Sequence, residues 1–544
     1  MGRLIARARY TNRRLSRVSS PIVDEMDMLV FGDQTVLRFC TPSILLGQPQ
    51  LADPLGTDVS VSYTGELGSP LEFVGSSGRF ADTAALVTRC YRGDPETDQT
   101  FLLTNGSTGA NWTIALYLQR SLEQGERVVV SRGAHISLPQ VLTDLRVPWD
   151  YLPARVQPGL DGVPVATPAE VMAVLAERDD VRALCVNGPS YEGLFLDVVG
   201  IRAALDAEGF NDVLLIVDEA WGAHLPFAPG LADRAAFAQG ADIVNASVHK
   251  QGGALQGTAV LVARRIGGGG EPRVDIDALQ GAFLSLASTS PSYQLLASTD
   301  AAIRTLEADG GRMLDDCARL ASDLAGDLRR RAPGIELFRR SDAGLSDGTS
   351  DPLKVTVTLP GEVAGSGLQR ALEAADIVVE KATFETLTFL IPFQLLTWQL
   401  ETDAIGRVVN AVAVLLADPG DPLPVGRPNL GDPLSAGREA RLMEAYEAAA
   451  LRPKAVSLKY EDAVGAIAAE RVAAYPPGVP IVAEGYEVGQ AEADYLVAVH
   501  LAQGYLVSNG GSKDGEVLVV PPDHDPRRAG TSLIAGEAPG HGRP

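Results

Sequence analysis

A lysine and an aspartate follow two short apolar runs in the middle of the chain. Asp218 ends the run Val213–Val217, and Lys250 comes shortly after the run Ile243–Ser247. Because ligands of open α/β sheets bind at the carboxyl ends of strands, we expect both side chains at one sheet edge. A buried lysine loses its charge and attacks aldehydes, while a carboxylate can hold a pyridinium proton. The pair therefore predicts a Schiff-base anchor for pyridoxal 5'-phosphate (PLP).

Two further segments offer groups that such a cofactor needs. Asn105–Asn111, with the hydroxyls of Ser107 and Thr108, follows a strand-like run and precedes a helix, so it suits an anion. His135 follows the strand-like run Arg127–Ser131, where an imidazole can stack on a pyridine ring. Taken alone, the first segment is equally typical of an ordinary helix cap, and the second of a structural histidine.

The segments that must position these groups alternate between strands and helices. This alternation, from about residue 100 to 265, is typical of a mostly parallel sheet buried on both faces. We expect strands at Phe101–Thr104, Arg127–Ser131, Ala183–Asn187, Val213–Asp218, Asp242–Ser247 and Thr258–Ala263, and helices at Thr113–Leu122 and Val198–Glu208.

The later part of the chain predicts smaller units. We expect helices at Ser292–Glu307, Met313–Arg331, Leu368–Ala375 and Ala404–Ala417, and strands at Leu353–Leu359, Ile377–Glu380 and Thr386–Ile391. The Pro/Gly-rich stretch Asp418–Pro433 is typical of a linker. The expected parts are an N-terminal arm (1–60), a PLP-binding large domain (61–300), a small α+β domain (301–420), a C-terminal domain (421–520) and a disordered tail (521–544).

Composition excludes several classes of protein. The 544 residues are 46% hydrophobic, which is ample for a large core, and the net charge of -23 disfavours nucleic acid and anionic membranes as partners. The scattered cysteines (Cys40, Cys90, Cys185 and Cys317) indicate reduced thiols in a cytoplasmic protein. The histidines show no metal-ligand spacing, and no apolar run reaches membrane-spanning length. The Arg-rich N-terminus is compatible with a transit segment or with a flexible or helical arm.

Taken in order, the motifs resemble those of the Orn/Lys/Arg decarboxylase family, bacterial basic amino acid decarboxylases among the fold type I PLP enzymes. The resemblance covers about residues 100–300 and rests on Asn105–Asn111, the segment with His135, Asn187–Gly193, Asp218–His224, Ser247–Lys250 and Thr289–Tyr293. It returns in Asp376–Lys381 and in the turn Tyr475-Pro476-Pro477-Gly478-Val479-Pro480. It implies an α/β fold type I PLP-dependent transferase-like large domain with smaller α+β C-terminal domains.

The resemblance also implies a role for each residue. Lys250 would carry the Schiff base, Asp218 would bind the pyridine nitrogen, and His135 would stack on the ring. Ser107, Thr108, Ser247 and His249 would surround the phosphate, Trp221 would lie beside the cofactor, Ser290 would reach the cofactor of a second subunit, and Glu380 and Tyr475 would lie near the substrate entrance. The shared Ser290 implies an obligate homodimer.

Two segments depart from the family pattern. Around Phe39–Gln50 there is no Pro-Gly-His-Lys, and Thr41-Pro42-Ser43 stands there instead. The Tyr-Pro-Pro-Gly turn is followed by Ala483–Tyr486, where relatives usually have Pro-Gly-Glu. The chain also offers no room for a receiver-like N-terminal domain, which favours a dimer or small oligomer.

The function expected from these features is α-decarboxylation of a basic amino acid such as arginine, lysine or ornithine. Lys250 or His249 would return a proton to the α-carbon, and Glu380 would pair with the distal cation of the substrate. The altered N-terminal segment leaves two alternatives open: a PLP-dependent oxidase or aminotransferase acting on a specialised amino acid, and a non-catalytic protein of the PLP fold. An aminotransferase needs an arginine for the α-carboxylate, and the sequence places none.

Overall fold

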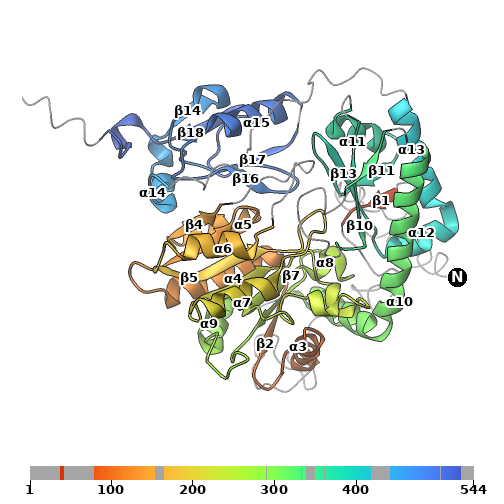
Figure 1. Ribbon diagram of the computed structural model, residues 1–544, viewed down its shortest axis with the longest axis horizontal. Helices are drawn as coiled ribbons and strands as arrows, with labels where there is room; N and C mark the ends of the chain where they lie inside the picture. The colour runs from red at the N-terminus through yellow and green to blue at the C-terminus, as the bar shows by residue number, and fades with distance from the viewer. Residues whose placement is uncertain are drawn as a thin grey trace, which may run out of the picture.

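The computed structural model describes residues 37–41, 79–153, 165–288, 291–332, 334–338, 350–360, 363–417, 441–502 and 504–528. Within these residues a large α/β unit lies below two smaller units in Figure 1. The expected linker Asp418–Pro433 and residue Ser290 lie outside the described residues.

A seven-stranded sheet forms the centre of the large unit, in the order β2-β8-β7-β6-β5-β3-β4. Its strands are β2 (Gln99–Leu103), β3 (Arg127–Ser131), β4 (Trp149–Leu152), β5 (Val181–Asn187), β6 (Leu214–Asp218), β7 (Ile243–Ala246) and β8 (Ala259–Ala263). Strands β4, β3, β5, β6 and β7 run parallel, and β8 is antiparallel to both of its neighbours. The carboxyl ends of five parallel strands therefore meet at one edge.

The expected strands of the large sheet are confirmed, with ends shifted by a few residues at most. The strand β4 was not expected from the sequence, because a four-residue run with Asp150 inside it carries little apolar pattern. The helices of this unit are α3 (Arg79–Cys90), α4 (Gly106–Ser121), α5 (Ser137–Asp144), α6 (Pro168–Leu175), α7 (Val198–Ala207), α8 (Val248–Gln251) and α9 (Ile276–Leu286), with 3-10 turns at Leu225–Phe227 and Ala232–Arg234.

One helix, α10 (Tyr293–Arg331), replaces the two that the sequence predicted between residues 292 and 331. It runs for 39 residues along the right side of Figure 1 and connects the large unit to the small one. Gly310 and Gly311 lie between the two predicted helices and inside the observed one. A methyl group on Gly310 would come within 3.2 Å of Phe227, and one on Gly311 within 3.3 Å of Pro229. The glycines therefore permit close packing against the large unit.

The small unit holds a four-stranded antiparallel sheet in the order β12-β13-β10-β9. Its elements are β9 (Glu336–Leu337), β10 (Lys354–Thr358), α11 (Gly365–Glu373), β11 (Ile377–Val379), β12 (Lys381–Ala382), β13 (Thr386–Leu390), α12 (Gln394–Thr402) and α13 (Ala404–Ala417). The N-terminal strand β1 (Leu37–Phe39) pairs in parallel with β11. This pairing brings the residues after β1 next to the residues after β11.

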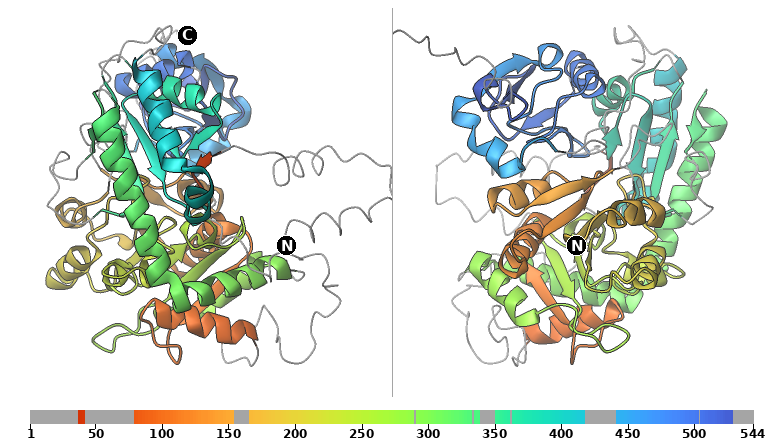
Figure 2. Two further views of the ribbon diagram at one scale, coloured as in Figure 1. Left: turned by 90° about the vertical axis from the view of Figure 1, so that its right-hand side faces the viewer. Right: turned by 60° about the vertical axis from the view of Figure 1, so that its left-hand side comes forward.

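The C-terminal unit lies above the β4 and α5 side of the large unit, as the blue ribbon in Figures 1 and 2 shows. It contains the pair β14 (Val456–Lys459) and β18 (Glu516–Val519) and the sheet of β15 (Val472–Ala474), β16 (Val479–Val482) and β17 (Leu506–Ser508), with helices α14 (Ala445–Ala450) and α15 (Gln490–Leu501) and 3-10 turns at Arg452–Lys454 and Tyr460–Asp462. A further 3-10 turn at Pro522–His524 opens the segment expected as a tail, and Arg527 there pairs with Glu487.

Candidate active site

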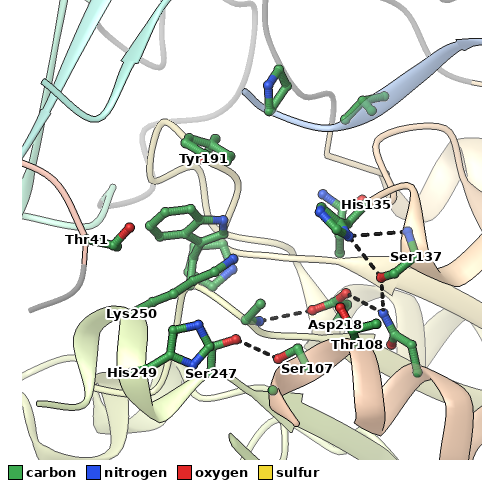
Figure 3. A pocket seen from close by; sticks show the side chains of 18 of the residues that line it. Thr41, Ser107, Thr108, His135, Ser137, Tyr191, Asp218, Ser247, His249 and Lys250 are labelled. Atoms are coloured by element: carbon green, nitrogen blue, oxygen red, sulfur yellow. Dashed lines mark hydrogen bonds between the residues drawn. The ribbon is translucent and has the colours of Figure 1, made fainter. Parts of the chain in front are cut away.

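A cavity of about 600 Å³ opens at the carboxyl edge of the parallel strands. A volume of this size is typical of small-molecule sites. The predicted residues that line it are Ser107, Thr108, His135, Asp218, Trp221, Ser247, His249, Lys250 and Tyr475. Figure 3 shows Lys250 and His135 on opposite sides of the cavity, with Ser107 and Ser247 at its lower end. The structure thus brings together residues that are up to 368 positions apart (475 − 107).

Lys250 lies in the single turn of α8, directly after β7. Its Nζ is 4.1 Å from the centroid of the Trp221 ring. Burial lowers the pKa of Lys250, although Asp218 and Glu380 act in the opposite direction. A lowered pKa favours the neutral amine, which is the form that attacks a carbonyl.

Asp218 ends β6 and points toward the same cavity. Its Oδ1 accepts a hydrogen bond from the Ala220 N–H at 3.1 Å, and its Oδ2 lies 3.5 Å from Nδ2 of Asn111. Asn111 is itself held by Asn245, whose Nδ2 donates to Asn111 Oδ1 at 2.8 Å. Burial raises the pKa of Asp218, while Lys250, Ala220 and the amides of Asn111 and Asn245 lower it. The carboxylate is therefore oriented by its hydrogen-bond partners.

Hydroxyls and backbone groups gather where helix α4 begins. Ser107 in its first turn and Ser247, the residue before α8, have their Oγ atoms 2.7 Å apart. Gly106 adopts φ 69°, a conformation that glycine takes readily, and the first turn of α4 carries no acidic residue. His249 donates from Nδ1 to the Thr258 carbonyl at 2.7 Å, and its Nε2 takes no part in this bond. This is a site that suits a phosphate.

His135 lies on the wall opposite Lys250. Its Nδ1 contacts Ser137 Oγ at 2.9 Å and accepts from the Ser137 N–H at 3.3 Å, so the proton of the neutral ring sits on Nε2. Burial, and then the charge of Lys250, lowers the pKa of His135 to about 4. The edge of the Tyr475 ring completes this wall, with ring centroids 6.2 Å apart. A neutral imidazole held in this way offers a flat face to the cavity.

Glu380 lies outside the wall of the cavity. It is buried, and its Oε2 accepts a hydrogen bond from the Thr41 N–H at 2.7 Å, while Thr41 itself lines the cavity. Burial raises the pKa of Glu380, and the Thr41 bond and the charges of Lys354 and Lys250 lower it. Of the predicted substrate residues, Tyr475 thus lies on the wall, while Glu380 stands behind Thr41.

Three residues near the cavity had no role in the sequence-based prediction. Lys354 places its Nζ 4.2 Å from the Trp221 ring centroid and 3.1 Å from the Ser190 carbonyl, and burial lowers its pKa to about 8. The Tyr191 ring lies 4.4 Å from the Trp221 ring, and Asn111 supports Asp218. Tyr191 and Asn111 stand inside motifs that were recognised. Lys354 begins a strand of another unit, and a lysine in a buried strand was the one available signal.

Two kinds of group are missing from the described part of this site. No arginine lines the cavity among the residues that the structure describes. Nor does this part of the chain contain a cluster of three or more His, Cys, Asp or Glu side chains that could hold a metal ion. In the same residues, no helix is long and apolar enough to cross a membrane.

The sequence and the fold both match known proteins. The family described as "Orn/Lys/Arg decarboxylase, major domain" matches residues 52–345, which is more than half of the chain. The chain belongs to the Orn/Lys/Arg decarboxylase family. The resemblance seen in the motifs is therefore confirmed, and so is the expected enzyme class, an amino acid decarboxylase.

Two similar proteins are named as decarboxylases of two different amino acids, arginine and lysine. The chain is 26% identical over 409 residues to an arginine decarboxylase of Bacillus anthracis, covering 73% of this chain and 77% of that protein. It is 24% identical over 444 residues to the constitutive lysine decarboxylase of Escherichia coli, covering 70% of this chain and 58% of that protein.

Solved structures of decarboxylases share the fold of this family member. A lysine decarboxylase of Francisella novicida gives a TM-score of 0.65 at 19% identity, covering 85% of this chain and 74% of that one. Lysine decarboxylase A of Pseudomonas aeruginosa gives 0.66 at 18% identity, covering 87% and 77%. The expected α/β fold type I architecture is confirmed.

Proposed function

We propose that the protein catalyses PLP-dependent α-decarboxylation of a basic amino acid, arginine, lysine, ornithine or a relative of these. The observation that carries the proposal is the convergence of Lys250, Asp218 and His135 on one cavity in a chain of this family. The names of the relatives, arginine decarboxylase and lysine decarboxylase, support the substrate class.

The residues of the cavity fit PLP in their charges and in their positions along the cavity. Lys250 would hold the aldehyde carbon, Asp218 would accept the N–H of the ring, and His135 would stack on it. The hydroxyls of Ser107, Thr108 and Ser247 and the ring of His249 would surround the phosphate at the start of α4. The first turn of that helix carries no acidic residue that would repel a dianion, and Ser107 and Ser247 offer it hydroxyl groups.

When bound, PLP supplies an electron-accepting pyridinium ring on which a bond to the α-carbon can break. Asp218 contributes the negative charge that keeps the ring nitrogen protonated, and Ala220 and Asn111 hold that carboxylate in place. Lys250 can return a proton to the α-carbon, since its lowered pKa makes the ammonium a stronger acid than an ordinary lysine. His249 is the second proposed donor, with Nε2 on the side away from the Thr258 carbonyl.

The lining of the cavity favours decarboxylation over transamination. Among the described residues the wall carries no arginine that would hold an α-carboxylate. This observation weighs against the aminotransferase alternative that the sequence left open.

Glu380 and Tyr475 are the proposed substrate residues. Tyr475 stands at the mouth, 44% exposed, and its ring can contact the aliphatic part of an arriving side chain. Glu380 would act through its charge from behind Thr41, because it does not reach the wall itself. Both roles suit a substrate with a distal cation.

We further propose a homodimer in the cytoplasm, with Ser290 of each subunit reaching the cofactor of the other. None of the four cysteines, all of which are described, forms a disulfide, and burial raises the pKa of the Cys185 and Cys317 thiols. Unreactive thiols of this kind are typical of proteins in a reducing compartment.

The proposal is tested with purified protein supplied with PLP and offered L-arginine, L-lysine or L-ornithine, in air and under argon. We expect carbon dioxide and the matching amine in equal amounts from one of these, at the same rate with and without oxygen. Lys250→Ala should abolish the visible absorption band of the bound cofactor, whereas Lys459→Ala, on the exposed surface of β14, should keep it. Release of hydrogen peroxide or of a keto acid in place of the amine would contradict the proposal.

A further inference from the structure

The segment of residues 132–137, here called the His135 loop, is fastened to the C-terminal unit. Ile136, which directly follows His135, donates its N–H to the Gly478 carbonyl at 2.7 Å. Its carbonyl accepts from Nη1 of Arg471 at 3.4 Å and also from the Gln140 N–H at 3.2 Å. The backbone of the residue next to His135 is thus held on both sides by the turn after β15 and by Arg471.

Arg132 fastens the other end of the His135 loop. It is fully buried and donates to the carbonyls of Pro480 and Ile481, at 2.5 Å and 3.0 Å. Its guanidinium also lies over the Tyr151 ring, 4.6 Å from the centroid. Both ends of the loop therefore depend on where the strand β16 lies.

The Glu484 carboxylate orients the Arg471 side chain. Both side chains are 0% exposed, and they form two parallel contacts, Nε to Oε2 at 3.0 Å and Nη2 to Oε1 at 2.9 Å. Nη2 also donates to Thr143 Oγ1 in α5 at 3.2 Å. Arg471 therefore connects Glu484 to helix α5 and to the Ile136 carbonyl, both of which lie beside His135 in the chain.

The Glu484 carboxylate accepts hydrogen bonds from three side chains. Besides Arg471, its Oε1 receives Nη2 of Arg452 at 2.5 Å and Nδ2 of Asn509 at 2.9 Å. Burial raises the pKa of Glu484, but Arg471, Asn509 and Arg452 outweigh it and leave the pKa below its usual value. A buried ion pair that is fully hydrogen-bonded has one geometry, and removing one charge leaves the other uncompensated.

Glu484 lies in the segment Ala483-Glu484-Gly485-Tyr486, which directly follows β16. Tyr486 turns its hydroxyl to the large unit, where it accepts from the Tyr151 N–H at 3.1 Å. Glu484 thus acts on the His135 loop through Arg471, whereas Tyr486 contacts β4 directly.

We propose that Glu484, acting through Arg471, is a positioning residue for His135, so that the C-terminal unit sets how tightly the active site holds its cofactor. The inference rests on the proposed function, in which His135 stacks on the ring of PLP. Neither Glu484 nor Arg471 lines the described cavity, and the contact of Arg471 with the Ile136 carbonyl leads from this pair to the His135 loop.

The experiment compares two buried glutamates of the same unit in the full-length protein. Glu470 is also 0% exposed, and its carboxylate accepts from the Leu518 N–H at 2.7 Å and from Ser508, both inside the C-terminal unit. PLP is titrated into the PLP-free protein and followed by its visible absorption. We expect Glu484→Gln to raise the Kd for PLP about fivefold and Glu470→Gln to change it less than about twofold.

A double-mutant cycle separates positioning from a general loss of stability. His135→Ala should itself raise the Kd for PLP, and adding Glu484→Gln to it should change the Kd less than about twofold, because the contact it serves is gone. If Glu484→Gln does not fold, Arg471→Lys takes its place, since it keeps the charge but loses the forked contact to Glu484 and the separate contacts to Ile136 and Thr143.

The outcomes distinguish this inference from the proposed function. If the wild-type protein binds no PLP, the proposed function fails, and this inference fails with it. If the wild type binds PLP but Glu484→Gln matches Glu470→Gln, or if its effect is unchanged in the His135→Ala background, the inference alone is overturned.

Discussion

The Oγ atoms of Ser107 and Ser247 lie 2.7 Å apart, although 140 positions separate the two residues in the chain. One sits in the first turn of α4, and the other is the residue before α8. In such a contact one hydroxyl donates to the other, so the second hydroxyl keeps a proton for a further acceptor. The pair therefore joins the start of α4 to the lysine segment and leaves one donor for an anion.

Removing either hydroxyl should weaken the grip on the phosphate of PLP. A hydrogen bond to a charged group contributes about 1.5–3 kcal/mol, so Ser107→Ala and Ser247→Ala should each raise the Kd for PLP by about tenfold or more. The double variant should lose less than the sum, since the two hydroxyls share a bond. Equilibrium titration of the PLP-free protein measures this. Ser457→Ala, which removes an exposed bond to Glu516, is the matched control and should leave the Kd unchanged.

Asp218→Asn should separate cofactor binding from catalysis. The amide keeps the shape of the side chain and its bond from Ala220, but it removes the charge that holds the proton on the ring. We expect kcat for carbon dioxide release to fall by about 100-fold to 1,000-fold, as for the loss of other preorganised charge contacts. Asp233→Asn, which alters an exposed pair with Arg92, is the control. A kcat within about threefold of wild type would show that Asp218 does not serve the ring nitrogen.

Local sequence pattern was enough for most of the sheet. The strand Arg127–Ser131 and the helix Ala404–Ala417 have the bounds that the sequence predicted, because apolar runs and helical spacing are local signals. The strand β1 has no such signal. It has three residues, and its partner β11 lies 340 positions further along (377 − 37). A pairing of that kind depends on the tertiary fold.

The position of a site residue could be predicted from the sequence where that residue lies at the end of a strand. Asp218 ends a parallel strand, and His135 and Lys250 each follow one within a few residues, so a single rule brings them to one edge. Lys354 reaches the same region from a strand of the small unit, and its one mark in the sequence is a lysine in a buried strand. The position of Glu380 behind Thr41 likewise depends on the pairing of β1 with β11.

His135 should act without changing its charge in the working range. Because burial and Lys250 lower its pKa to about 4, the ring is neutral from about pH 5 upward. His135→Phe keeps a flat ring that cannot titrate, so the shape of the kcat/KM profile between about pH 5 and pH 9 should not change. His135→Ala should raise the Kd for PLP about threefold to tenfold, the range expected for a lost ring contact. A profile that loses an acidic limb in His135→Phe would contradict the lowered pKa.

Tyr475 should affect the arrival of substrate more than its chemistry. It stands at the mouth, and its ring meets the His135 ring edge to face. Tyr475→Ala should therefore raise KM about threefold to tenfold with kcat within about twofold, the pattern of lost uniform binding. Steady-state rates of carbon dioxide release measure both constants. Tyr505→Ala, at an exposed position whose carbonyl receives the Tyr475 N–H, controls for general disturbance of this surface.

Asp351 should make the stability of the protein depend on acid. Its carboxylate receives His224 Nε2 at 3.3 Å, Gln251 Nε2 at 3.2 Å and the Leu353 N–H at 3.0 Å. Burial raises its pKa, but His224 and the other partners outweigh burial and bring the pKa from 3.8 to about 2. The folded pKa is thus below the unfolded one, so the stabilisation is complete above about pH 4 and is lost as the pH falls toward 2.

The size of this acid effect follows from the two pKa values. It amounts to about 2 kcal/mol in total, roughly half of which should be gone by about pH 3. Denaturant unfolding of wild type and Asp351→Asn between about pH 6 and pH 3 measures it as a difference in free energy that shrinks as the pH falls. Asp233→Asn, which changes an exposed carboxylate, should show a difference that stays flat. A flat difference for Asp351→Asn as well would mean that the pKa of Asp351 is the same in the folded and the unfolded protein.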